Sequence, residues 1–164
     1  MNVLRDDLPL ALQVVDSAKV VEVDVRDDLR NGREPFARLM TAKSKVEPSG
    51  ALLVRAIFEP VPLYTVMGKH GFVYHTESLA PDDWMIWFYR DVAVVDVRDM
   101  EPPEPLSYTL AALKTLPPDA TLVQINVRVP MLLLPRLEAE GYAYDVRELA
   151  EDRVHVFITR KGTA

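Results

Sequence analysis

The chain has 164 residues, of which 49% are hydrophobic and 27% charged, and its net charge is −6 with a pI near 5.1. This composition is typical of a soluble globular protein, and the acidic balance argues against nucleic-acid binding. The absence of cysteine excludes disulfides, thiolate metal sites and a cysteine nucleophile. No run approaches the roughly 18 apolar residues of a membrane span and no secretion signal is visible, so we expect a cytoplasmic protein without membrane or nucleic-acid partners.

Residues 1–19 form an N-terminal arm that has no counterpart elsewhere in the chain. Asp7 is placed to cap a short helix over Pro9–Val15, which is apolar on nearly all sides. We expect this arm to pack on the body of the protein. Binding of a partner, or exchange of the arm between subunits, is the alternative.

The remainder is a tandem repeat, with a first copy at residues 20–90 and a second at 91–164. From Glu34 to Arg90, adding 70 to a residue number gives its counterpart without a gap, and 13 of these 57 positions are identical. Prolines and glycines are prominent among them, and because they define turns they indicate a shared backbone. Before Glu34 the offset is 72, so the first copy carries two extra residues in its first turn.

In the first copy, apolar alternation predicts strands and 3.6-residue spacing predicts helices. The strands are Val21–Val25, Leu52–Phe58, Phe72–Glu77 and Trp84–Arg90, and the helices are Pro35–Val46 and Pro62–His70.

The second copy follows the same order. Strands are predicted over Ala93–Arg98, Leu122–Arg128, Tyr142–Glu148 and Arg153–Thr159, and helices from Pro105 to Pro117 and from Pro130 to a C-cap at Gly141. Each copy is therefore expected to be an α/β two-layer sandwich of order β-α-β-α-β-β, with a four-stranded mixed sheet and both helices on one face.

The last strand of the first copy predicts an apolar surface opposite the helices. Met85, Trp87 and Tyr89 point away from Trp84, Ile86 and Phe88, and Phe157 takes the same side in the second copy. A sheet face without helices should be polar, so we expect this one to be covered. The candidates are the second copy's sheet, the N-terminal arm or another subunit in a homodimer, and the candidate interface residues are Met85, Trp87, Tyr89 and Phe157.

The element order and the strand–turn–helix segment Asp96–Leu106 resemble the TusA/SirA-like sulfur-carrier fold, in which a Cys-Pro-x-Pro motif opens the first helix. Here the segment reads Pro102-Pro103-Glu104-Pro105, so Pro102 stands where those carriers have the persulfide cysteine.

The copies are more similar still to the uncharacterised domain family 2249 (DUF2249), through Asp24-Val25-Arg26, Glu34-Pro35 and Pro60-Val61-Pro62-Leu63 and their counterparts. Many relatives carry an Asn-Asp-His-Asp-Pro-type segment, where this chain has Asn126-Val127-Arg128-Val129-Pro130. The resemblance implies a bacterial, cysteine-less relative of the sulfur carriers, linked to redox or nitrogen-oxide metabolism.

Six residues are candidates for ligand binding. Arg26 and Arg98 end the first strands, where open α/β folds place ligands; they act as anion clamps or form Asp–Arg pairs that pin the turn. Glu34 and Glu104 lie at helix starts, where the helix dipole favours a carboxylate without any catalysis. Asn126 and Arg128 replace the family's polar segment and are expected to line a pocket.

No histidine pair has metal-ligand spacing, and we expect neither a metal nor a cofactor. A metal site built from His75, Glu59 and Glu77 is the weaker alternative.

These patterns favour a non-enzymatic module that binds a protein partner or a small ligand. The alternative is an enzyme, or a small-ligand or metal-binding protein, with a site at the inter-repeat interface that uses Glu34, Glu104, Arg26 and Arg98. RNA binding is a third hypothesis, which the acidic pI disfavours.

Overall fold

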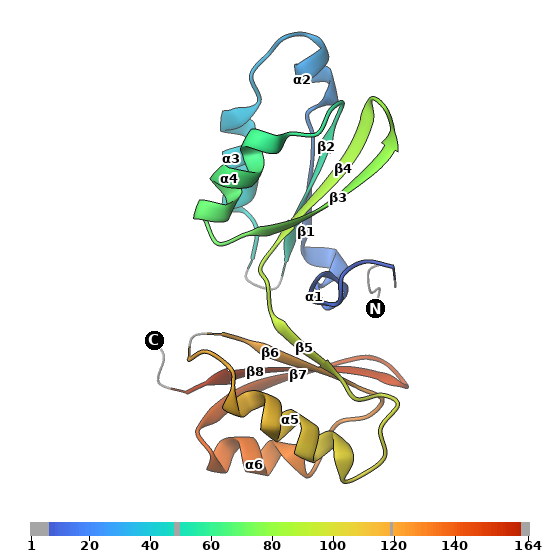
Figure 1. Ribbon diagram of the computed structural model, residues 1–164, viewed down its shortest axis with the longest axis vertical. Coiled ribbons are helices and arrows are strands. Elements are labelled where there is room, and N and C mark those ends of the chain that lie inside the picture. The colour runs from blue at the N-terminus through green and yellow to red at the C-terminus, as the bar shows by residue number, and fades with distance from the viewer. Residues whose placement is uncertain (1–6, 48–49, 119, 162–164) are drawn as a thin grey trace. The chain divides into compact units, whose positions relative to one another are not determined.

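The computed structural model describes residues 7–47, 50–118 and 120–161 (Figure 1). The chain divides into two compact units between Asp91 and Val92, and each unit holds one copy of the repeat.

The first unit is a four-stranded mixed sheet with helices. Its strands follow the order β1-β2-β4-β3, in which β1 and β2 are parallel and the other neighbours antiparallel. The elements are α1 (Leu10–Gln13), a 3₁₀ turn (Ser17–Lys19), β1 (Val20–Asp24), α2 (Arg26–Arg30), α3 (Phe36–Ser44), β2 (Ala51–Ala56), α4 (Val61–Lys69), β3 (Val73–Ala80) and β4 (Asp83–Tyr89).

The second unit repeats this topology, with the strand order β5-β6-β8-β7 and one parallel pair, β5 and β6. Its elements are β5 (Ala93–Asp96), α5 (Glu104–Lys114), β6 (Leu122–Asn126), α6 (Leu133–Ala139), β7 (Tyr142–Ala150) and β8 (Arg153–Arg160). The predicted sandwich of two tandem repeats is confirmed.

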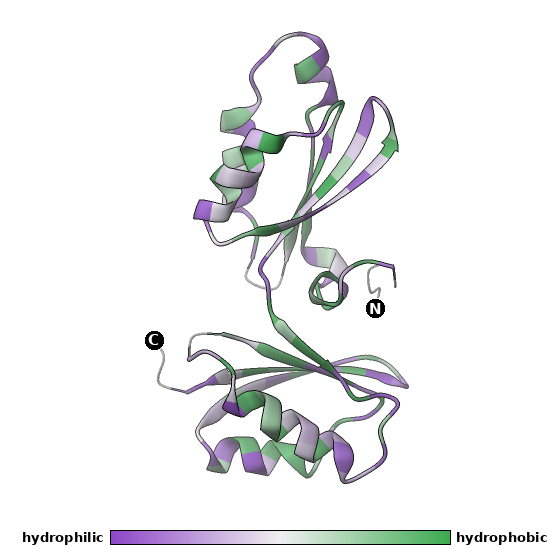
Figure 2. Cartoon of the chain, in the orientation of Figure 1, coloured by the Kyte–Doolittle hydropathy of each residue, from purple (hydrophilic) through white to green (hydrophobic). Residues whose placement is uncertain are grey.

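The core of each unit lies between its sheet and its helices. In the first unit Ile86 and Phe88 of β4 are fully buried against α3 and α4. In the second, Leu113 of α5 and Leu137 of α6 pack against β8. Figure 2 shows the hydrophobic colour along β6, as expected of a strand whose side chains are all buried.

A second apolar cluster covers the other face of the first sheet. Leu8 and Leu12 of the arm pack against Trp87 and Tyr89, and Trp87 is only 6% exposed. Of the three covers considered for this face, the structure therefore shows the N-terminal arm. The helix in this arm begins after Pro9 without a side-chain cap, so the expected Asp7 cap was wrong.

The first turn of the first unit contains a helix that the sequence did not predict. The two extra residues allow Arg26–Arg30 to form α2, in which the Leu29 N–H donates to the Val25 carbonyl at 3.0 Å. Asp27 and Asp28 lie in its first turn, where the helix dipole favours carboxylates. Leu29 packs against the core, so α2 closes this end of the sandwich.

The second helix of the second unit also begins later than predicted. Pro130 precedes a turn, α6 starts at Leu133, and Pro135 falls in its first helical turn, where a missing N–H is tolerated. Gly141 follows the helix with φ 86°, as the predicted C-cap requires, and Gly71 does the same after α4 with φ 85°.

Candidate binding site in the second unit

Both first strands end in the same Asp–Arg pair. Arg26 Nε and Nη2 donate to the two carboxylate oxygens of Asp24 at 2.9 and 2.6 Å, and Arg98 binds Asp96 in the same way at 2.9 and 2.7 Å. The Arg26 guanidinium lowers the pKa of Asp24 to about 2, and Arg98 likewise lowers the pKa of Asp96. Each arginine is thus held by a carboxylate of its own turn, and the anion-clamp role stays a prediction.

The surroundings of these pairs differ between the units. In the first, Asp83 accepts from Arg55 at 2.8 Å and from Arg26 at 3.4 Å, so two arginines and two carboxylates balance. The counterparts of Arg55 and Asp83 in the second unit are Ile125 and Arg153. The two copies therefore carry opposite charge at one equivalent position.

The two candidate glutamates lie at helix starts, as expected. Glu34 Oε1 accepts the Phe36 backbone N–H at 2.8 Å, and Glu104 is the first residue of α5. They belong to different units, and their joint use as acid and base stays a prediction.

Asn126 and Arg128 line a cavity of about 320 Å³ within the second unit. It lies between the turn that opens α5, the end of β6 and the turn that opens α6. Most lining side chains are apolar, and the polar ones come from β6 and the residues just after it. The lining consists of Met100, Pro102, Pro103, Pro105, Leu106, Gln124, Asn126, Val127, Arg128, Val129, Pro130, Met131, Leu132 and Leu133.

A chain of buried hydrogen bonds runs from this cavity into the core. Asn126 Nδ2 donates to Gln124 Oε1 at 3.0 Å, Gln124 Nε2 donates to Thr109 Oγ1 at 2.7 Å, and Thr109 Oγ1 donates to the Pro105 carbonyl at 2.8 Å. All three side chains are buried. Because each of these side chains is hydrogen-bonded to the next, the network fixes the cavity wall on the core side.

Sequence reasoning missed two members of this chain, Gln124 and Thr109. Their counterparts in the first unit are Val54 and Leu39, and that of Asn126 is Ala56; all three are buried in the apolar core. A comparison of the two copies could have indicated them, because the second copy has polar residues at these three positions where the first copy has inward-facing apolar ones.

The unused hydrogen-bonding capacity at the cavity is mostly that of donors. Asn126 Oδ1 already accepts the backbone N–H groups of Val127 and Arg128, at 2.7 and 3.3 Å. Within the described part of the chain, no hydrogen bond or ion pair involves the exposed Arg128 guanidinium. The cavity thus offers a free cation beside apolar walls.

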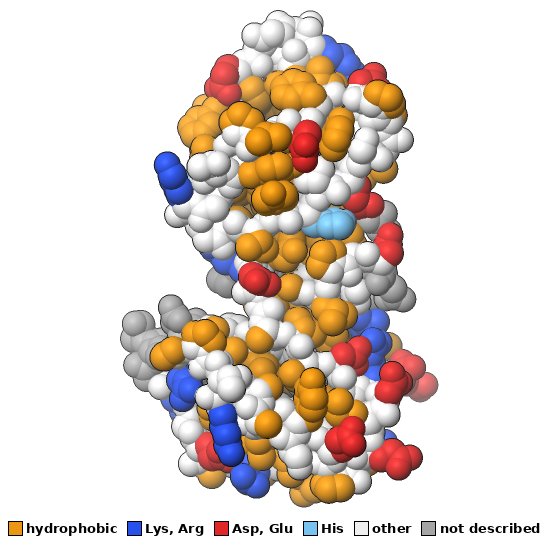
Figure 3. Space-filling view, in the orientation of Figure 1, with side chains coloured by type: hydrophobic (Ala, Val, Ile, Leu, Met, Phe, Trp, Pro, Cys, Tyr) orange, Lys and Arg blue, Asp and Glu red, His pale blue; other side chains and the backbone are white. Residues whose placement is uncertain are grey.

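The rim of the cavity is apolar and open. Met131 and Leu132 are 71% and 76% exposed, the largest exposed fractions among the large hydrophobic side chains of the described residues. Figure 3 shows apolar side chains exposed among charged ones on the surface of the second unit. Exposed apolar side chains beside a cavity are typical of a ligand-binding site.

His155 lies on the sheet face opposite the helices and is 2% exposed. Burial, followed by the charges of Arg153, Arg98 and Arg147, lowers its pKa to about 4, so it is neutral at pH 7. Its counterpart in the first unit is Met85.

The weaker metal alternative, built from His75, Glu59 and Glu77, was wrong. Over residues 7–47, 50–118 and 120–161, no three or more histidine, aspartate or glutamate side chains lie together in a way that could hold a metal ion. His75 lies on β3 with its ladder partner Trp87, on the face that the arm covers.

The candidate interface residues lie on the sheet faces opposite the helices. Met85, Trp87 and Tyr89 pack with the arm, and in the second unit the Arg147 guanidinium lies 4.1 Å from the Phe157 ring centroid. A homodimer through these residues stays a prediction.

A family model described as "Uncharacterized conserved protein (DUF2249)" matches residues 22–90 and again residues 94–160. The chain belongs to this family. Both matches coincide with the repeats, so the protein is a tandem DUF2249 chain. No curated protein and no solved structure matches it. Among the described residues of this DUF2249 protein, none of the helices has the length and hydropathy needed to cross a membrane.

Proposed function

We propose that the second unit binds a small molecule with an apolar body and an anionic group, without catalysing a reaction. The observation that carries the proposal is the cavity that Asn126 and Arg128 line. Its volume of about 320 Å³ falls at the lower end of the range for small-molecule pockets.

The apolar body is supported by the cavity walls. Proline and aliphatic side chains supply most of the lining, and Met131 and Leu132 extend it onto the surface. Transfer of apolar ligand surface from water to such walls stabilises a complex by about 25 cal/mol per Å².

The anionic group is supported by the donors that remain unused. The carbonyl oxygen of Asn126 already accepts two backbone N–H groups, and the guanidinium of Arg128 is a cationic donor in the cavity lining. A carboxylate, sulfonate or phosphate accepts hydrogen bonds from both, whereas a cationic ligand would be repelled.

The absence of turnover is supported by the side chains at hand. The described lining residues include no carboxylate, histidine, hydroxyl or amine that would serve as nucleophile, general acid or general base.

The resemblance to sulfur carriers enters this proposal through the position of the cavity. Pro102, Pro103 and Pro105 form part of its wall, and they occupy the segment where those carriers hold the reactive cysteine. We infer that the chain is a cysteine-less relative that retained the surface and lost the sulfur chemistry, and that it works in the cytoplasm of a bacterium in redox or nitrogen-oxide metabolism.

The test uses two dyes that share one ring system. 8-Anilinonaphthalene-1-sulfonate is apolar and anionic, whereas N-phenyl-1-naphthylamine lacks the sulfonate. Fluorescence titration of the full chain should show tighter binding of the sulfonate. Arg128→Gln should weaken sulfonate binding about tenfold or more, because a charge-assisted hydrogen bond contributes about 1.5–3 kcal/mol, and should leave binding of the uncharged dye within about twofold.

Arg136→Gln is the matched control. Arg136 is exposed on α6 and paired with Glu140 at 3.1 Å, outside the cavity lining. Equal binding of both dyes, or equal losses in the Arg128 and Arg136 variants, would show that the cavity does not select an anion.

A further inference from the structure

The first unit has an open sheet edge at β1. The Val25 N–H donates to the Arg55 carbonyl of β2 at 3.0 Å. Because alternate residues of a parallel strand face the same neighbour, Val21 and Val23 also pair with β2, while the N–H and C=O of Glu22 face away from the sheet. Since β2 is the only strand beside β1 in the described part of the unit, these outward groups are available to another strand.

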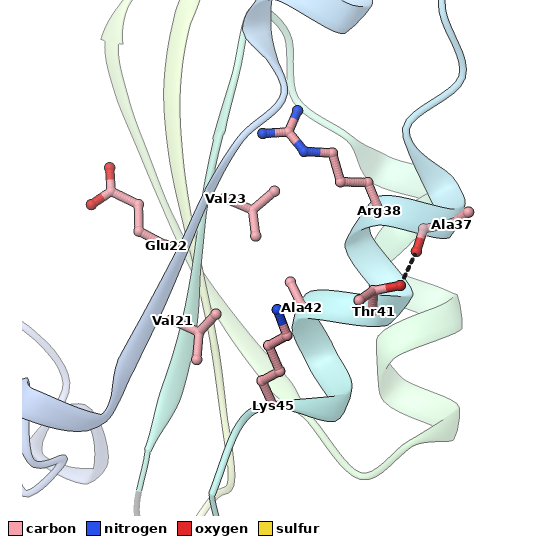
Figure 4. A pocket seen from close by; sticks show the side chains of 8 residues that line it. All are labelled: Val21, Glu22, Val23, Ala37, Arg38, Thr41, Ala42 and Lys45. Atoms are coloured by element: carbon pink, nitrogen blue, oxygen red, sulfur yellow. Dashed lines mark hydrogen bonds between the residues drawn. The ribbon is translucent and has the colours of Figure 1, made fainter.

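A groove of about 390 Å³ lies along this edge, between β1 and α3 (Figure 4). Val21 and Val23 point across it toward the helix, whereas the Glu22 side chain points to the opposite side of β1. Glu22 therefore contributes its backbone to the groove. The lining consists of Val21, Glu22, Val23, Ala37, Arg38, Thr41, Ala42 and Lys45.

The helix side of the groove is positively charged. Figure 4 shows Arg38 extending from α3 toward β1, and Lys45, the residue directly after α3, lies about two helical turns further along, beside Ala42. Arg38 shares the carboxylate of Asp28 with Arg33, at 2.6 and 3.2 Å, so two cations face one anion. Among the described residues no carboxylate pairs with Lys45.

We propose that β1 and α3 form a docking groove for an acidic, extended peptide segment of a protein partner, which adds to the sheet as a fifth strand beside β1. The outward backbone groups at Glu22 hydrogen-bond to the peptide main chain, and alternate apolar side chains of the peptide pack on Val21, Val23 and Ala42. Arg38 and Lys45 attract its acidic side chains and disfavour a basic segment.

The second unit provides an internal comparison. Val97 donates to the Ile125 carbonyl at 3.0 Å, so the edge of β5 is oriented in the same way. The counterparts of Arg38 and Lys45 are Tyr108 of α5 and Thr115, the residue directly after α5. The open edge is thus common to both repeats, whereas the cationic wall belongs to the first, and only the first is proposed to bind acidic peptides.

The test uses the full chain and a fluorescein-labelled peptide of four Glu-Val repeats. Anisotropy should show saturable binding that the corresponding Lys-Val peptide does not show. The double variant Arg38→Glu/Lys45→Glu should weaken binding about tenfold, and Lys43→Glu should change it less than about twofold. Lys43 is the matched control because it carries the same charge in the last turn of α3, two residues before Lys45, but does not line the groove.

The strand-addition geometry is tested with methylated peptides. Methylating the backbone nitrogens of alternate residues should abolish binding for one alternate set and preserve it for the other, because only one set faces β1. Amide chemical shifts should change along β1 and α3 and stay constant along β5 and α5.

Three results would overturn the proposal: equal binding of acidic and basic peptides, equal effects of both methylation patterns, or shift changes confined to other elements. Concentration-dependent shifts along β1 without any peptide would also overturn it, because a second copy of the chain would then occupy the edge. None of these results bears on dye binding by the second unit, so this proposal and the cavity proposal fail independently.

Discussion

Gln124 and Thr109 of the second unit share a buried hydrogen bond of 2.7 Å, at positions where the first unit has Val54 and Leu39. The hydrogen bond between these two side chains takes the place of apolar packing. It stabilises the core only while both side chains are present, because either one alone would be a buried polar group without its partner. Its energetics follow from the cost of an unpaired buried group, which exceeds the net gain from a paired one.

Thr109→Val should therefore destabilise the protein by about 1–3 kcal/mol, because Gln124 Nε2 loses its acceptor inside the core. Urea unfolding followed by far-ultraviolet circular dichroism measures the change. Thr41→Val is the control: its hydroxyl donates to the carbonyl four residues earlier at 2.9 Å, as that of Thr109 does, but it is exposed. Similar losses in both variants would show that the buried link contributes nothing of its own.

Replacing all three side chains of the buried hydrogen-bond network should restore stability and remove the binding site. The triple variant Thr109→Leu/Gln124→Val/Asn126→Ala installs the first unit's residues, and replacement of all polar partners by apolar groups can be nearly neutral. We expect it to be more stable than Thr109→Val and to bind the anionic dye weakly. If it proves the less stable of the two, the polar chain supports the fold in its own right.

The arm should stabilise the first unit through Leu12, which is fully buried against the sheet. Leu12→Ala should cost about 2–5 kcal/mol and shift tryptophan emission to longer wavelength as Trp87 gains contact with water. Leu10→Ala, on the same helix at 44% exposure, should change neither quantity. Unchanged emission in Leu12→Ala would mean that the arm does not shield Trp87.

His155 should make the second unit sensitive to mild acid. Its pKa is about 4 when folded, below the ordinary 6.5, so the unfolded chain binds the proton more tightly. Stability should fall as pH drops from about 6.5 to 4, by at most roughly 3 kcal/mol, and level off below that. Unfolding at several pH values measures the slope, and His155→Met, the first unit's residue, should remove it. A nuclear magnetic resonance titration midpoint near 6.5 for this histidine would contradict the prediction.

The Asp24 carboxylate should lose its low pKa when its partner is removed. Arg26→Gln should raise the pKa from about 2 toward 3.8, because Arg26 supplies the bidentate hydrogen bonds. Since the folded pKa is the lower one, the pair stabilises above about pH 3.8 and the effect disappears as pH falls through about 2. Carbon-13 carboxyl titration measures the shift, and Arg30→Gln, which removes only the Asp27 contact, should leave Asp24 unchanged.

The topology could be predicted because the repeat supplied two different sequences for the same fold, which can be compared position by position. Gly71 and Gly141 recur because both occupy positive φ after a helix, and Ile86 and Phe88 alternate with Trp87 as a two-faced strand requires. Helix α2 was missed because its stability depends on Leu29 reaching the core, a tertiary contact that five residues of local sequence do not reveal.

The site was only partly predictable for the same reason. Asn126 and Arg128 drew attention because they replace a polar family segment, and the structure places both in the cavity lining. Thr109 looked like an ordinary helical residue, and its importance depends on Gln124, which is distant in sequence and adjacent in space.

The two extra residues in the first turn of the first unit determine how one end of its sandwich is closed. In the first unit they let α2 bring Leu29 onto the core, while the shorter turn of the second unit leaves Met100 and Pro102 in the lining of a cavity. After duplication, a change in loop length thus contributed to closing this end of one copy with a helix and to forming a cavity at the same end of the other. The number of residues between the Asp-x-Arg and Glu-Pro motifs should therefore distinguish, across this family, copies closed by such a helix from copies that hold a cavity at this end.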